Sequence, residues 1–93
     1  MRGKDVWARI QALRQRRYNL TFRDLEDVAK DAGWRFDRNH GNHAIYTKQG
    51  FLGNLSIPRR NLKGKTALRI LAFIESSLPL EEGEERISGE ENR

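Results

Sequence analysis

The sequence lacks cysteine altogether and has only two histidines, two prolines and no long apolar run. Without cysteine there is no disulfide framework, no thiolate nucleophile and no cysteine-ligated zinc. The two histidines and scattered acids do not form a metal-ligand spacing, so we expect no metal and no other cofactor. No apolar stretch approaches the roughly 18 residues of a membrane span, and the N-terminus lacks the apolar middle of a signal peptide. These absences predict a soluble, cytoplasmic protein with no membrane partner.

Charge is distributed unevenly along the 93 residues. Residues 81–93 hold six Glu and two Arg, a net charge of −4, so residues 1–80 carry +9 against +5 for the whole chain. A basic body of this size indicates a polyanionic partner, most often nucleic acid, although simple solubility would also account for it. Residues 81–93 have almost nothing to bury and are predicted to be a disordered tail. Residues 1–80 are expected to form one domain, because a chain this short supports a single modest core.

Apolar residues at helical spacing predict three helices. Alternating apolar and polar residues between turns predict three short strands, and the first of them, in which Trp34 and Phe36 alternate with Arg35 and Asp37, is expected to be half-buried. Thr21 is the expected N-cap of the second helix, with Asp24 at its third position, and Gly33 is its left-handed C-cap. Pro58 ends the third strand and Pro79 ends the third helix. The expected helices cover about residues 5–17, 22–32 and 66–77, and the expected strands cover residues 34–37, 43–48 and 55–57.

The order α-α-β-β-β-α predicts an α+β two-layer sandwich, a three-stranded antiparallel meander with helices on one face. Strand parity leaves two arrangements open for the second strand. If Ile45 faces the helices, His43 does too and reaches solvent only because it stands at the strand's end. If Ala44 and Tyr46 face inward, His43 lies on the open face of the sheet. We favour Ile45 inward.

Six short patterns occur in a fixed order between Phe22 and Leu78. They are Ala32-Gly33-Trp34 after a capped helix, Arg38, Gly41-Asn42-His43 with Tyr46 three residues later, Ser56-Ile57-Pro58, the basic loop of residues 59–65, and the leucine-rich helix start at residues 67–71. Together they resemble the HicA-type toxins of bacterial type II toxin–antitoxin modules. Two features depart from the family pattern. Asn42 stands where serine is most frequent, and the N-terminal helix, residues 1–18, has no counterpart in the typical short toxin.

The resemblance implies a fold like the double-stranded RNA-binding domain (dsRBD) and an endoribonuclease activity on single-stranded messenger RNA. It also implies a protein partner, a cognate HicB-type antitoxin that covers the histidine. Asn42 would tune or weaken the site. The additional helix would supply either extra core or a surface for a homodimer.

Metal-independent RNA cleavage needs proton transfer at the 2′-hydroxyl and the leaving 5′-oxygen, which an imidazole can perform near neutral pH. Cations stabilise the charge on the phosphorane. His43 is the candidate catalytic residue, supported by the turn residues Gly41 and Asn42. His40 is interpreted as an exposed polar residue, or as a proton shuttle if the turn folds over the site. The candidate RNA-binding residues, on strand ends and loops, are Arg38, Lys48, Arg59, Arg60, Lys63 and Lys65.

Three functions stay open at this point. The first is an endoribonuclease toxin with His43 at its centre. The second is a non-catalytic module that binds structured RNA with the same basic face. The third is a protein-interaction domain whose basic surface meets an acidic partner. Trp34 is assigned to packing, because it follows a helix cap, whereas Tyr46 could either pack or stack on a base.

Overall fold

The computed structural model describes residues 2–79, and their side chains from residue 5 onward, so the predicted disorder of residues 81–93 lies outside the described part. Its elements are α1 (Arg2–Gln15), the 3-10 helix η1 (Arg17–Asn19), α2 (Phe22–Asp31), β1 (Arg35–His40), β2 (His43–Thr47), β3 (Leu55–Pro58) and α3 (Gly64–Ser76). The α+β class and the order α-α-β-β-β-α are confirmed. α3 begins two residues earlier than predicted, and β1 runs on to His40 because the turn after it is shorter.

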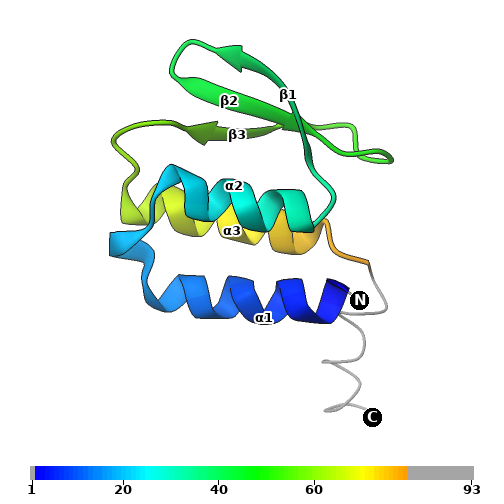
Figure 1. Cartoon of the computed structure of the whole chain (residues 1–93), viewed down its shortest axis with the longest axis horizontal. Helices are drawn as coiled ribbons and strands as arrows, with labels where there is room; N and C mark the ends of the chain where they lie inside the picture. The colour runs from blue at the N-terminus through cyan, green and yellow to red at the C-terminus, as the bar shows by residue number, and fades with distance from the viewer. Residues whose placement is uncertain (1, 80–93) are drawn as a thin grey trace.

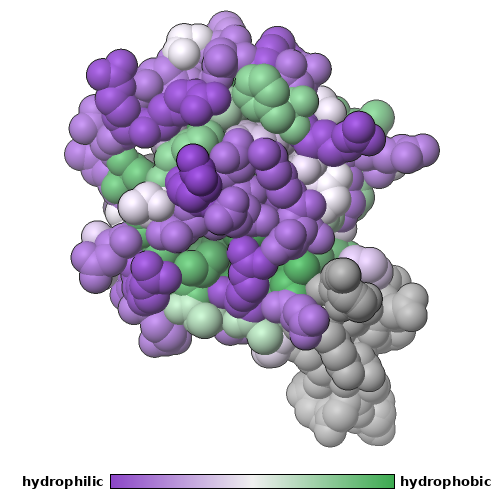
Figure 2. All heavy atoms as spheres, in the orientation of Figure 1, coloured by the Kyte–Doolittle hydropathy of each residue, from purple (hydrophilic) through white to green (hydrophobic). Residues whose placement is uncertain are grey.

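The sheet lies on one side of α2 and α3, and α1 lies on their other side (Figure 1). All three helices therefore lie on the same side of the sheet, α2 and α3 directly against it and α1 behind them, and the second face of the sheet is open. The helix α1 thus adds a layer to the two-layer sandwich that the sequence predicts. Val6 and Ile10 of α1 are buried in the same core as the sheet residues. In Figure 2 an apolar seam is visible between α1 and the helices above it. The N-terminal helix thus supplies extra core. None of the helices described is long and apolar enough to cross a membrane.

The ends of α2 are defined as the sequence predicts. The Thr21 hydroxyl accepts a hydrogen bond from the Asp24 amide at 3.2 Å, and the Asp24 carboxylate accepts one from the Thr21 amide at 2.9 Å. At the other end Gly33 has φ +100°, and the amides of Gly33 and Trp34 donate to the carbonyls of Lys30 and Ala29. This capping box and this Schellman motif satisfy backbone groups that a helix end leaves unpaired.

The three strands form one antiparallel sheet in the order β1-β2-β3. Tyr46 pairs with Leu55 of β3, and its hydroxyl donates to Glu26 of α2 at 2.6 Å, so Tyr46 faces the helices. Side chains alternate along a strand, so Ile45 and His43 face away from the helices. Our preference for Ile45 inward is therefore wrong. The run Ala44-Ile45-Tyr46 is apolar throughout, so hydrophobicity alone could not choose the inner face, and the partners on β3 and α2 decide it.

β1 is an edge strand whose six residues are all exposed, in contrast to the half-buried strand predicted there. Phe36 pairs with Tyr46 and Arg38 pairs with Ile45, which leaves Asp37 as a bulge between them. The bulge reverses the parity, so Phe36 faces the helical side and Arg38 faces the open side. Phe36 stays 45% exposed and meets the Tyr46 ring edge-on, with centroids 5.8 Å apart. The helices therefore leave the helical side of strand β1 largely uncovered.

Trp34 lies at the junction between α2 and β1 and is only 1% exposed. Its indole Nε1 donates to the Ser77 hydroxyl at 3.0 Å. Its ring packs against Phe51 and Phe73, with centroids 5.9 and 5.4 Å away. The assignment of Trp34 to packing is confirmed.

Candidate nucleic-acid interface

Three connections meet at one end of the molecule, at the left in Figure 1. They are the α1–α2 connection (residues 16–21), the β1–β2 turn (residues 41–42) and the β3–α3 loop (residues 59–63). We call this region the hairpin end. It forms because α1, β1 and β3 all run toward it, while α2, β2 and α3 all run away from it.

The hairpin end is strongly basic. Its three connections contain five basic and no acidic residues, and Lys65 follows in the first turn of α3. Arg16 lies 3.8 Å from the capping carboxylate of Asp24. Within residues 2–79, Lys63 and Lys65 are exposed and form no ion pair with a carboxylate. The cations come from the α1–α2 connection, the β3–α3 loop and the start of α3, while the β1–β2 turn carries none. Cations brought together in this way produce a positive field that suits a polyanion.

His43 is the first residue of β2 and is exposed. It faces the open side of the sheet, where no described helix covers it (Figure 1). Its ring is therefore accessible from a whole face rather than only from the strand's end. This is the second of the two arrangements that strand parity leaves open, with Ala44 and Tyr46 inward and His43 on the open face.

His40 and His43 are direct partners across β1 and β2. The turn between them has only two residues, and Gly41 adopts φ +61°. A positive φ at the first central position alone is the pattern of a type II′ hairpin turn, which favours glycine there. A Cβ on Gly41 would meet nothing within 4 Å, so glycine is needed for backbone conformation and not for space.

Two asparagines beside the histidines hold two of the predicted arginines. The Asn39 amide oxygen accepts from Nε and Nη2 of Arg59 at 3.0 and 2.9 Å. The Asn42 amide oxygen accepts from Nε of Arg60 at 3.3 Å, and its backbone carbonyl accepts from the Arg59 amide at 2.8 Å. The hairpin tip is thus fastened to the chain that leaves β3. This gives Asn42, the departure from the family pattern, a structural role.

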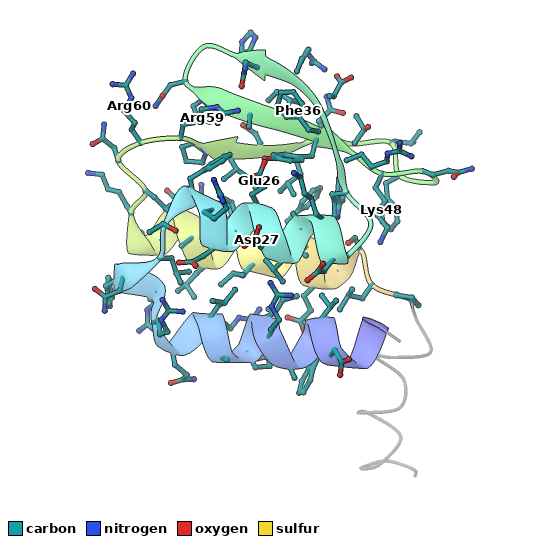
Figure 3. All side chains as sticks on the ribbon, in the orientation of Figure 1. Glu26, Asp27, Phe36, Lys48, Arg59 and Arg60 are labelled. Carbon is teal, nitrogen blue, oxygen red and sulfur yellow. The ribbon has the colours of Figure 1, made fainter. Side chains whose placement is uncertain are left out.

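The two arginines point in different directions. The guanidinium of Arg59 lies on the helical side, 4.7 Å from the centroid of the Phe22 ring. Arg60 stays beside the turn through Asn42. Figure 3 shows both at the hairpin end. Arg38 lies on the open face with the histidines and forms an ion pair with Asp37.

Lys48 lies apart from the other predicted residues, at the opposite end of the molecule (Figure 3). Lys48 is five positions after His43 along extended chain, a distance of about 16 Å. Its Nζ donates to the Ser77 carbonyl at 2.7 Å, at the C-terminal end of α3, and stands 5.1 Å from the centroid of Phe51. Burial lowers the pKa of Lys48. These contacts give Lys48 a packing role.

The start of α3 faces the hairpin end without a side-chain cap. Lys63 occupies the N-cap position and forms no capping hydrogen bond. The Tyr18 ring lies against this turn, since a Cβ on Gly64 would come within 2.5 Å of Tyr18 Cε1. The Arg17 guanidinium stands 5.0 Å from the centroid of the same ring, which is 78% exposed. The N-terminal extension therefore adds an aromatic residue and cations to the hairpin end.

Tyr46 is not available to stack on a base, because it is fully buried. Burial raises the pKa of its hydroxyl above the ordinary value, and the hydrogen bond to Glu26 raises it further. The carboxylate of Glu26 also lies 3.6 Å from Lys30 and 3.9 Å from Arg23. Of the two roles left open for Tyr46, the structure selects packing.

Sequence reasoning missed the roles of Asn39 and Glu26, and it did not pair His40 with His43. For the histidine pair a signal was present, because a two-residue Gly-Asn turn places the residues on either side of it opposite each other. No comparable signal existed for Asn39, whose partner comes from a distant loop. Among residues 2–79 no three His, Asp or Glu side chains come close enough to hold a metal ion.

Compared with protein-family models, curated proteins and solved structures, the chain gives no match.

Proposed function

We propose that this protein binds single-stranded RNA at the hairpin end and cleaves it without a metal ion, as an endoribonuclease toxin of the HicA type. The observation that carries the proposal is the position of His43. It is exposed on the open sheet face, at the end of the molecule where the cations of the α1–α2 connection and the β3–α3 loop gather.

In the proposed reaction the 2′-hydroxyl of one nucleotide attacks the adjacent phosphorus, and the bond to the 5′-oxygen breaks. His43 transfers a proton at one of these two oxygens. Arg60 is hydrogen-bonded to Asn42, the residue before His43, and Lys63 and Lys65 at the start of α3 extend the positive surface for the RNA backbone. Cations so arranged stabilise the charge that develops on the phosphorane. Lys48 is left out of this site because of its place at the opposite end.

The dsRBD-like fold and the HicB-type antitoxin belong to the same proposal. An antitoxin that covers His43 would have to occupy the open face of the sheet near the hairpin end. The compartment that we propose is the cytoplasm, where messenger RNA is available.

The test is incubation of the purified full-length chain with a long messenger RNA in EDTA. We expect the parent to cleave the RNA and His43→Ala to leave it intact. Thr47→Ala is the matched control, because Thr47 is exposed at the far end of the same strand. In cells, expression of the parent should arrest growth and expression of His43→Ala should not.

An alternative function is a non-catalytic RNA-binding module, which the basic hairpin end also supports. It predicts that parent and His43→Ala bind the RNA equally well and that neither cleaves it. Equal cleavage by both proteins would remove His43 from the mechanism.

A further inference from the structure

We infer that His40 is the second proton-transfer group of the proposed site, so that RNA cleavage uses a pair of imidazoles across the β1–β2 hairpin. The inference rests on the proposed function and deepens it. A lone histidine would have to act as both base and acid, whereas a pair can divide these tasks between two rings.

The backbone places the two histidines together. His40 and His43 are the last cross-strand pair before the two-residue turn, and both are exposed. Directly opposed residues have their Cβ atoms on the order of 5 Å apart and share one face of the sheet. That face is the open one, since Tyr46 and its β3 partner Leu55 face the helices. Both rings can therefore reach a single phosphate that approaches the open face.

The surroundings of the pair hold it in place and attract an anion. Asn39 precedes His40 and Asn42 precedes His43 in the sequence, and each asparagine is hydrogen-bonded to an arginine of the β3–α3 loop. The hairpin tip is therefore fixed to the β3–α3 loop by side-chain hydrogen bonds. Immobilised groups reach their productive geometry at a lower entropic cost than mobile ones.

The charged groups around the pair are mostly cationic. Arg38 shares the open face from β1, and Arg60 approaches from the β3–α3 loop. Asp37 is the one acidic residue within the three strands, and it is paired with Arg38. No described helix packs on this face (Figure 1). A phosphodiester thus meets two imidazoles and a guanidinium without an unpaired carboxylate among the strand residues.

The proposed step is balanced in protons and bonds. A neutral imidazole of the pair takes the proton of the 2′-hydroxyl while its oxygen forms a bond to phosphorus. The other imidazole, protonated beforehand, gives its proton to the 5′-oxygen as the phosphorus–oxygen bond breaks. The products are a 2′,3′-cyclic phosphate and a 5′-hydroxyl. Proton exchange with water restores the starting state, so no other reactant is needed.

The experiment measures kcat/KM against pH with full-length protein in EDTA, using RNA and the activated substrate uridine 3′-(p-nitrophenyl phosphate). We compare the parent, His40→Ala, His40→Gln, His43→Ala and the control Thr47→Ala. The parent should give a bell-shaped profile with one limb from each histidine. Both His40 variants should lose about 10²- to 10⁴-fold on RNA and one limb of the profile. Nitrophenolate leaves without a proton, so the activated substrate should rescue the variant that lacks the acid and not the one that lacks the base.

Different outcomes of this experiment refute the histidine pair and the proposed ribonuclease activity. If the parent cleaves, His43→Ala does not, and both His40 variants keep parental rates and both limbs, the pair is refuted while the ribonuclease stands. A slower His40 variant with an unchanged profile and no selective rescue would also refute the pair, because it would show only a positioning effect. If the folded parent cleaves neither substrate, the proposed function itself is refuted.

Discussion

The hydrogen bond between Tyr46 and Glu26 joins the sheet to α2, and its removal in Tyr46→Phe gives a stability change that can be worked out. The bond is 2.6 Å long, the ring is fully buried, and the Glu26 side chain is 16% exposed. A hydrogen bond to a charged group contributes about 1.5–3 kcal/mol. Lys30 still lies near the carboxylate in the variant, at 3.6 Å, so we expect the lower end of this range. The phenyl ring fills the same space as the tyrosine ring, so the substitution adds no cost for an empty cavity.

A loss of about 1.5 kcal/mol lowers the Tm of a domain of this size by about 6–12 °C. The assay is thermal and urea unfolding at pH 7, followed by far-UV circular dichroism. Tyr18→Phe is the matched control, because Tyr18 is the second tyrosine of the chain and is 78% exposed. The control should stay within about 0.5 kcal/mol of the parent. A Tyr46→Phe variant as stable as that control would refute the energetic role of this hydrogen bond.

The same substitution has a signature at alkaline pH. The pKa of Tyr46 is raised in the folded protein, mainly by burial and then by Glu26. Above its ordinary pKa of 10.0 the unfolded chain loses this proton while the folded protein keeps it, so stability falls as pH rises. The stability difference between parent and Tyr46→Phe should therefore shrink above pH 10. Lys48, whose lowered pKa acts in the opposite direction, is present in both proteins and cancels. A pH-independent difference would show that Tyr46 titrates normally.

Two further predictions concern the ends of the molecule. Gly33→Ala forces alanine into φ +100° with its Cβ 3.1 Å from Lys48 Cε, and we expect it to cost more than about 1–2 kcal/mol in urea unfolding. Gly50→Ala is the control, because Gly50 has φ +89° and open space around it, so alanine there adds only backbone strain. Equal losses of stability in the two variants would show that the Lys48 side chain moves aside without cost. Arg59→Ala with Arg60→Ala should reduce the salt slope of binding to a 2′-O-methyl RNA, which cannot be cleaved, by about 1.4 for two lost phosphate contacts. Lys48→Met should leave that slope unchanged. A slope that fell in Lys48→Met and not in the double arginine variant would place the RNA surface at the opposite end of the molecule.

Local chemistry was enough to predict several elements of the fold. Thr21, Asp24 and Gly33 define the ends of α2 because caps and a positive φ depend on residues a few positions apart. Apolar residues at helical spacing located the three helices for the same reason. The element order and the α+β class follow from these local signals together with chain length.

What the sequence could not decide involves contacts between distant segments. The inner face of β2 was misjudged, since a run of three apolar residues has no unique inward side until Tyr46 meets Glu26 and Leu55. The bulge at Asp37 breaks the parity of β1, which no alternation rule anticipates.

For the candidate site too, some features follow from the sequence and others only from the tertiary structure. The sequence by itself determined that His43 follows a tight glycine turn and that the chain is basic before residue 81. Only the tertiary structure decided that His43 is on the open face beside His40, that Asn39 and Asn42 hold Arg59 and Arg60, and that Lys48 lies at the other end. The physical reason is that a charge or an imidazole acts through space. Its neighbours are set by the directions in which the packed helices and strands run and not by its position in the chain.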